Sequence, residues 1–321
     1  MPSQRYEYSN LGYGLLGQVV SIVSAMPFQE YISRYILEPL GMENTLWEYS
    51  EAPDKLLALG YKCEEGKWIL QPMLNDGAFG AMGGLITSIA DFRKYVSLHL
   101  SAWPPRNDPE MGPVRRSTLR KMQQPQFSRL YADAKDLNDN PCPVISGYGY
   151  GLGIAENCEG IRRISHGGAL PGFGSNYVFY PDLGIGLMAF CNVTYTTPWP
   201  YEEISKILFE ELDLKPRELP VSAILNSRKN QIVNWFKTWD KELEAEVFAE
   251  NFYLDSDRNT RISEFRPLLE DAGEIMQIGE INPRNQLRGS FELYGSKDSL
   301  NVFFTLSPEE DPKIQALYLW K

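Results

Sequence analysis

Two short clusters hold the side chains best suited to chemistry. Tyr8 and Asn10 lie near the start of the chain, and much further on His166 is followed by Gly167 and Gly168. A phenol is a poor base at neutral pH unless positive charge lowers its pKa, whereas an amide side chain both donates and accepts. Glycines let a second backbone approach closely, and a backbone N–H can stabilise a developing oxyanion. These residue types are suited to acyl transfer.

The text around both clusters follows a family pattern over roughly residues 2 to 213. The matching stretches, in order, are Pro2 to Tyr13, Pro39-Leu40-Gly41-Met42, Gly80 to Leu85 before Thr87 to Asp91, Gly147 to Gly153, and Pro171-Gly172-Phe173. The chain resembles the class C β-lactamase-like serine hydrolases, which include penicillin-binding proteins, D-amino peptidases and esterases. This resemblance implies acyl transfer to water from an ester or amide through a covalent serine adduct, with no cofactor and no metal.

The resemblance also assigns roles. Tyr8 would move the proton of an attacking serine together with a lysine, and Asn10 would touch that lysine and the substrate. His166-Gly167-Gly168 would border the substrate, and the N–H of Ala169 would donate to the oxyanion. True β-lactamases carry Lys-Thr-Gly at this place, so esterase or D-amino-acid peptidase chemistry fits better. The structural alternatives are that Tyr8 packs, Asn10 caps a helix and His166 is a framework residue.

The attacking group itself is missing. In relatives, Ser-x-x-Lys supplies the nucleophile and its activating amine, and no serine in this chain has a lysine three positions later. The resemblance therefore implies an N-terminally truncated family member, inactive as it stands. A non-catalytic module that binds a peptide-like or acyl ligand, a chain completed by a partner polypeptide, and recruitment of the Ser9 hydroxyl remain alternatives.

Composition excludes several classes of protein. The net charge of −11 offers no basic excess for nucleic acid. No run of 18 apolar residues predicts a membrane span, and no signal peptide is recognisable, although relatives are often periplasmic or secreted. The partner expected is a small-molecule or peptide-like substrate. Loss of the upstream segment would also expose an apolar cleft and a strand edge, which favours self-association.

Cysteine and histidine usage argues against a metal site. The chain has four scattered cysteines and two histidines, too few in any pattern for structural zinc. We expect buried free thiols, with a Cys142–Cys158 disulfide as the alternative if the protein is exported. His99 is predicted to cap the end of its helix. Gly12 to Gly17 spells a dinucleotide fingerprint but follows no apolar strand, so these glycines are expected to serve helix packing.

Periodicity indicates an α+β fold in two domains. Helices are expected from Ser9 or Asn10, from Pro27 and from Ser88, and a closing helix near 200–212. Four strands at about 150–155, 161–166, 174–180 and 185–191 would form an antiparallel meander. The predicted limits are a partial β-lactamase/transpeptidase-like domain over 1–213, a linker over 214–220, and a C-terminal α+β domain over 221–321, with the NTF2-like family as one candidate. In that domain an aromatic helix precedes strands near 287–294, 300–306 and 314–320.

Overall fold

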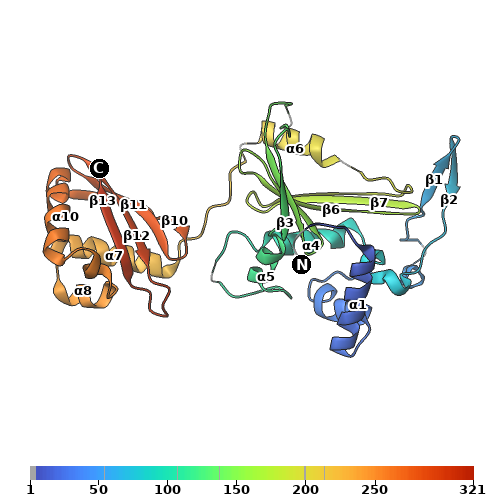
Figure 1. Ribbon diagram of the computed structural model, residues 1–321, viewed down its shortest axis with the longest axis horizontal. Coiled ribbons are helices and arrows are strands. Elements are labelled where there is room, and N and C mark those ends of the chain that lie inside the picture. The colour runs from blue at the N-terminus through green and yellow to red at the C-terminus, as the bar shows by residue number, and fades with distance from the viewer. Residues whose placement is uncertain (1–4, 54, 107, 137, 199, 213) are drawn as a thin grey trace. The chain divides into compact units, whose positions relative to one another are not determined.

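The computed structural model describes residues 5–53, 55–106, 108–136, 138–198, 200–212 and 214–321. It forms two compact units, one of Met1–Trp103 with Pro109–Arg217 and one of Pro104–Asp108 with Glu218–Lys321 (Figure 1). The predicted domain limit at residue 213 and the motif residues Pro2 to Gln4 lie outside the described residues.

The first unit is built on an antiparallel sheet whose spatial order follows the chain order. Its strands are β3 (Phe127–Tyr131), β4 (Val144–Gly149), β5 (Leu152–Glu156), β6 (Arg162–Leu170), β7 (Phe173–Tyr180) and β8 (Ile185–Cys191). The meander predicted from about residue 150 onward is confirmed, and two further strands precede it. Glycine-rich β4 was missed because glycine hides the alternation that marks a strand.

Helices cover both faces of this sheet (Figure 1). The side of Phe179 packs against Val96 of α4 (Ile89–Leu100), whereas Val178 and Tyr180 pack toward Phe209 of α6 (Pro200–Glu211). Alternate residues of a strand point to opposite faces, so β7 can be buried on both. α4 begins at Ser88 as predicted, with the Ser88 hydroxyl accepting from the Asp91 N–H.

The remaining elements of this unit are short, apart from the first helix. They are α1 (Asn10–Ser24), α2 (Phe28–Ile32), the π-helix Ser33–Leu37, the 3-10 turns Tyr49–Glu51 and Gly77–Phe79, α3 (Gly80–Gly83), α5 (Arg116–Met122), and the hairpin of β1 (Tyr61–Glu64) and β2 (Lys67–Leu70). In the described part of the chain no single helix is long and apolar enough to cross a membrane. α1 and the Phe28–Leu37 stretch pass that test only as a pair, across a 78° bend.

Helix α1 is held through its glycine side and leaves its apolar side open. A Cβ on Gly17 would come within 2.5 Å of the Ala81 Cβ, so the absence of a side chain permits the approach to α3. The predicted packing role of these glycines is thereby confirmed at Gly17. The apolar residues spaced along the opposite side are exposed, from 51% at Val19 to 81% at Val23.

The second unit places helices against a second antiparallel sheet (Figure 1). Its elements are α7 (Ala223–Thr238), α8 (Lys241–Val247), α9 (Phe252–Asp255), α10 (Arg258–Ala272), β9 (Ile275–Ile278), β10 (Asn282–Asn285), β11 (Arg288–Gly295), β12 (Ser299–Leu306) and β13 (Ile314–Trp320). The strand order is β10-β11-β12-β13, with β9 also paired to β11. The α+β class is confirmed; α10 was missed, since its apolar stripe is weak.

A fully buried tryptophan organises this second core. Trp235 packs edge-on against Phe248 and Phe265, and its indole N–H donates to the Glu244 carboxylate at 2.8 Å. Arg258 donates to both oxygens of that carboxylate at 2.9 Å. A buried charge needs such partners, and the Arg258 and Trp235 donors hold the Glu244 pKa below its usual range against the opposing effect of burial. The predicted aromatic stripe of α7 is therefore core.

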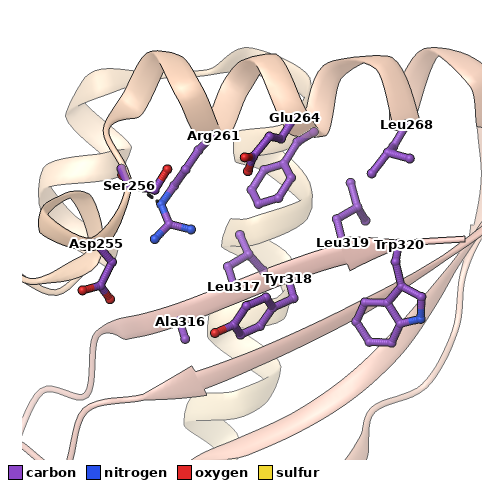
Figure 2. A pocket seen from close by; sticks show the side chains of 11 residues that line it. Asp255, Ser256, Arg261, Glu264, Leu268, Ala316, Leu317, Tyr318, Leu319 and Trp320 are labelled. Atoms are coloured by element: carbon purple, nitrogen blue, oxygen red, sulfur yellow. Dashed lines mark hydrogen bonds between the residues drawn. The ribbon is translucent and has the colours of Figure 1, made fainter.

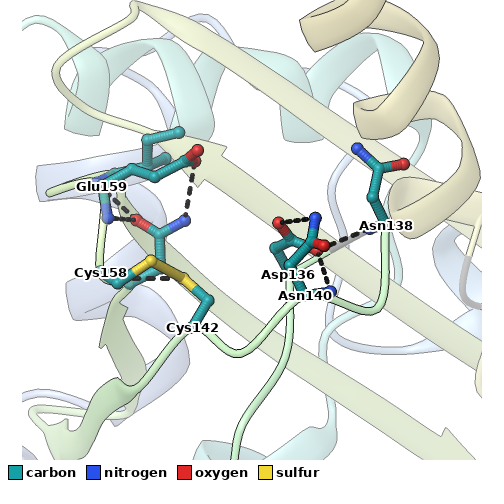
Figure 3. The surroundings of a disulfide bond; sticks show 8 residues. Asp136, Asn138, Asn140, Cys142, Cys158 and Glu159 are labelled. Carbon is teal, nitrogen blue, oxygen red and sulfur yellow. Dashed lines mark hydrogen bonds between the residues drawn. A yellow bond between two sulfur atoms is a disulfide. The ribbon is translucent and has the colours of Figure 1, made fainter.

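The expectation of free thiols is wrong for one pair of cysteines. Cys142 and Cys158 form a disulfide with their Cα atoms 5.2 Å apart (Figure 3). Ile145 pairs with Glu156, so the adjacent ends of β4 and β5 bring the two cysteines together. Strand pairing, which residue spacing does not reveal, decides this bond. Cys63 and Cys191 are free, and Cys63 is exposed, not buried as expected.

The predicted capping role of His99 is also wrong. Its ring is 1% exposed and packs against Tyr95 and Phe179, while the side-chain amide of Gln123 lies 3.2 Å from Nδ1. The register of α4 turns this residue toward the sheet instead of toward the helix end. Burial lowers the His99 pKa from 6.5 to about 4.

This pKa predicts acid-sensitive folding. Between pH 6.5 and about 4 the unfolded chain binds a proton at His99 that the folded chain does not. The contribution of neutral His99 to the free energy of unfolding is therefore fully present above pH 6.5. It is lost as the pH drops through that window, by about 3 kcal/mol in total. Urea unfolding at pH values from 7.5 to 4 measures the slope of the free energy of unfolding against pH. His99→Gln should flatten it, and an unchanged slope in this variant would contradict the assignment.

Candidate active site

The position of Tyr8 is set by the start of α1. The Ser9 hydroxyl accepts from the Gly12 N–H at 2.9 Å and caps the helix, so Tyr8 precedes the helix as expected. One turn later, the Tyr13 hydroxyl approaches Gly151 so closely that a Cβ there would lie 3.0 Å from it. Gly151 and Tyr150 both have positive φ, as a two-residue hairpin between β4 and β5 requires.

The glycine motif occupies the second half of β6, which pairs on one side only. The pairing with β5 stops at Ser165 opposite Gly153, whereas the pairing with β7 continues to Leu170 opposite Phe173. Among the described residues, the other edge of His166–Leu170 thus carries no strand, and Gly167 to Leu170 are exposed. Apart from the carbonyls of Gly167 and Leu170, which already have partners, backbone donors and acceptors on this edge are available to another extended chain.

Tyr8 and His166 lie near each other, and a residue that the sequence interpretation missed joins them. The ring centroids of Tyr8 and His166 are 6.2 Å apart, as are those of Tyr8 and Tyr148. The Tyr148 hydroxyl lies 3.0 Å from Nε2 of His166, and Nδ1 of His166 lies 2.7 Å from the Gly167 carbonyl oxygen. The Tyr6 ring packs against the Tyr148 ring at a tilt, with their centroids 4.9 Å apart.

The electrostatics of this cluster favour neutral groups. Burial lowers the pKa of His166 below its usual 6.5, although the Gly167 carbonyl partly opposes this. Burial, together with the neighbouring tyrosines, raises the pKa of Tyr148 well above its usual 10. His166 is therefore uncharged near neutral pH. It does not supply the positive charge that would lower the pKa of a nearby phenol such as that of Tyr8.

The other two predicted site residues, Asn10 and Ala169, are both exposed. Asn10 is the exposed first residue of α1, and its side chain makes no hydrogen bond to any described residue. Ala169 is paired with Gly174 on β7 and is exposed. The segment that follows β8 passes close to Gly174, and its Thr196 backbone leaves no room for a Cβ on that glycine. Tyr148 lies within Gly147 to Gly153, one of the stretches that match the family pattern. That match was the only sequence feature that could have indicated its place in the site.

The described residues offer no cluster of three or more histidine, cysteine or acidic side chains that could hold a metal ion. An open pocket of about 560 Å³ lies in the second unit, between α10 and β13 (Figure 2). Arg261 in its wall is already bonded to the carbonyls of Phe252 and Ser256. Its lining contains none of the predicted site residues.

Comparison with known proteins places this geometry in a family. The family model described as Beta-lactamase matches residues 1–208. "Beta-lactamase-like protein 2" of Dictyostelium discoideum is 23% identical over 328 residues, covering 96% of this chain and 56% of that protein. "Unguisins hydrolase ungD" of Aspergillus violaceofuscus is 26% identical over 214 residues, covering 61% of this chain and 36% of that protein.

A solved structure agrees with the fold. The octameric penicillin-binding protein homologue from Pyrococcus abyssi aligns with 98% of this chain and 59% of its own, with a TM-score of 0.52 and 21% identity. The chain spans about half the length of the curated relatives it matches. Because the family model covers well over half of the sequence, the chain belongs to the β-lactamase family of penicillin-binding-protein-like hydrolases.

Proposed function

We propose that this chain carries the substrate-binding half of a serine acyl-transfer site, of the esterase or D-amino-acid peptidase type, without a nucleophile of its own. The observation that carries the proposal is the one-sided strand His166–Leu170, which has Tyr8 beside its first residue. The hydrolase name of a relative, "Unguisins hydrolase ungD", agrees with this reaction class. His166 stands where true β-lactamases carry the lysine of Lys-Thr-Gly, and this difference sets the proposed reaction apart from β-lactam hydrolysis.

The open edge of β6 suits an extended, peptide-like substrate. Such a substrate can add to the strand through backbone hydrogen bonds, and Gly167 and Gly168 present no side chains that would hold it away. The N–H of Ala169 is then the donor for the oxyanion that forms on the attacked carbonyl. Asn10, exposed and unbonded to the described residues, is free to contact the substrate amide.

Tyr8 is the proton carrier in this scheme. Its side chain is 57% exposed, so its hydroxyl is accessible to an incoming hydroxyl nucleophile. Within this chain no Ser-x-x-Lys is present, and in this proposal a further polypeptide segment supplies the attacking serine. Catalysis by the whole protein would then follow the covalent route, with Tyr8 and the incoming lysine passing the serine proton to the leaving group.

A non-catalytic role is the second candidate, and two exposed features favour it. The apolar side of α1 is uncovered, and β8, an edge strand, is apolar at every position from Ile185 to Cys191. Continuous apolar runs are typical of strands buried on both sides, so β8 has the composition of a central strand. A module that binds a peptide-like or acyl ligand, with a partner polypeptide or a second copy on these surfaces, would use the same β6 edge.

Because this chain has no Ser-x-x-Lys nucleophile, we predict that it does not react with covalent probes of serine hydrolases. A fluorophosphonate and a fluorescent penicillin should add no mass to the purified chain, because neither finds an activated serine. Intact-protein mass spectrometry is the readout, with heat-denatured protein as the background control. A covalent adduct on native protein that is lost in Ser9→Ala would contradict the account, since it would identify a recruited hydroxyl.

Binding, by contrast, should survive. N-acetyl-D-alanyl-D-alanine should shift the amide resonances of His166 to Leu170 in a titration followed by NMR. Ala169→Pro should weaken that binding at least several-fold because it removes the proposed oxyanion donor. Ala132→Pro, in the exposed turn after β3 of the same unit and outside the site, is the control. Shifts confined to other elements, or equal binding by both variants, would count against the β6 edge.

The uncovered side of α1 predicts self-association. Light scattering should show species larger than a monomer at micromolar concentration, because exposed apolar helix faces associate. Leu15→Glu with Val19→Glu should shift the population toward monomer, whereas Gln18→Glu, which adds charge to the same helix without removing apolar area, should not. A monomeric parent chain at all concentrations would contradict this.

A further inference from the structure

The imidazole of His166 is hydrogen-bonded at both ring nitrogens. Nδ1 lies 2.7 Å from the carbonyl oxygen of Gly167, and Nε2 lies 3.0 Å from the hydroxyl of Tyr148. A carbonyl oxygen can only accept, so Nδ1 must carry the hydrogen of this contact. A neutral ring has one N–H, and Nε2 is therefore the acceptor of the Tyr148 O–H.

The surroundings of the ring hold it in this neutral form. The groups that face it are the Tyr8 ring ahead of α1, Tyr148 on β4, the Gly167 carbonyl on β6 and Tyr177 across the pair on β7. Burial raises the pKa values of Tyr148 and Tyr177 well above 10, so neither is charged near neutral pH. Burial lowers the pKa of His166 and raises that of Tyr148, so the phenol keeps the proton that it donates.

This hydrogen-bond chain acts on the backbone of the glycine motif. The Gly167 carbonyl and the Gly168 N–H belong to one planar peptide, so fixing the carbonyl fixes the N–H as well. Two successive glycines have few steric limits of their own, and their peptide planes rotate more freely than those of other residues. Pairing with Asn176 and Ser175 of β7 holds one side of these two glycines, and the His166 contact holds the Gly167 carbonyl in addition.

We propose that Tyr148 is a positioning residue: it commits His166 to the Nδ1–H tautomer, whose N–H holds the Gly167 carbonyl and so orients the edge that receives the substrate. This role rests on the proposed function of that edge. It also implies that His166 is not the base that accepts a nucleophile's proton, because its only free lone pair is occupied by Tyr148.

The second histidine of the chain provides an internal reference. The Gln123 amide nitrogen lies 3.2 Å from Nδ1 of His99, and the Trp103 indole donates to the Gln123 oxygen at 2.8 Å, which fixes the orientation of that amide. Because an amide nitrogen can only donate, His99 must be the Nε2–H tautomer. The two rings are thus expected to have opposite tautomers in one protein.

Two-bond ¹⁵N–¹H correlation spectra of the full chain distinguish protonated from unprotonated imidazole nitrogens. We expect Nδ1–H at His166 and Nε2–H at His99. In Tyr148→Phe the His166 ring should become a mixture of tautomers, and its pKa should rise by roughly one unit, since a donor to the neutral form is lost. Tyr6→Phe removes a hydroxyl from the same cluster without touching the ring and should change neither quantity.

The result is independent of whether a ligand binds. If His166 shows Nε2–H in the parent chain, or if Tyr148→Phe leaves its tautomer and titration unchanged, the positioning role is overturned whatever the ligand titration gives. If both change as expected while N-acetyl-D-alanyl-D-alanine does not bind, Tyr148 does position His166 and the proposed substrate function fails instead. His99 signals that stay constant in Tyr148→Phe exclude a general loss of fold.

Discussion

The one-sided pairing of β6 is the constraint on which the candidate site depends. Ile164 and Ser165 are paired with both β5 and β7, whereas His166–Leu170 is paired with β7 alone. β5 begins at Leu152, directly after the tight turn at Tyr150 and Gly151, so it does not extend alongside His166–Leu170. A strand that leaves the sheet interior in mid-course brings a rigid backbone edge to the surface, and rigidity of this kind is what a binding edge requires.

Close glycine contacts then bring the other half of the site to that edge. α1 approaches α3 at Gly17, where there is no room for a Cβ, and the β4–β5 turn at Gly151, where a Cβ would lie 3.0 Å from the Tyr13 hydroxyl. Tyr8 is consequently held beside His166 and Tyr148 without a hydrogen bond of its own among the described residues. The outer side of the same helix stays apolar and uncovered. α1 is thus packed on the side that faces α3 and uncovered on the opposite side.

Much of this could be predicted from residue patterns, and the failures have physical causes. The family, the α+β class and the β5–β8 meander followed from ordered motifs and from strand periodicity, while Ser9 and Ser88 marked helix starts through their hydroxyls. Tyr148 was missed because its significance lies in a hydrogen bond to a residue 18 positions away. The Cys142–Cys158 disulfide and the burial of His99 depend on strand register and helix rotation, which composition does not encode.

Amide hydrogen exchange along β6 tests the open edge most directly. The account predicts that Ile164 and Ser165 are protected throughout, whereas some amides within His166–Leu170 exchange rapidly and become protected when N-acetyl-D-alanyl-D-alanine is added. Uniform protection of the whole strand in the free protein would contradict it, because the second half would then already have a partner on both sides. Rapid exchange that the ligand leaves unchanged would contradict the role of this edge in binding.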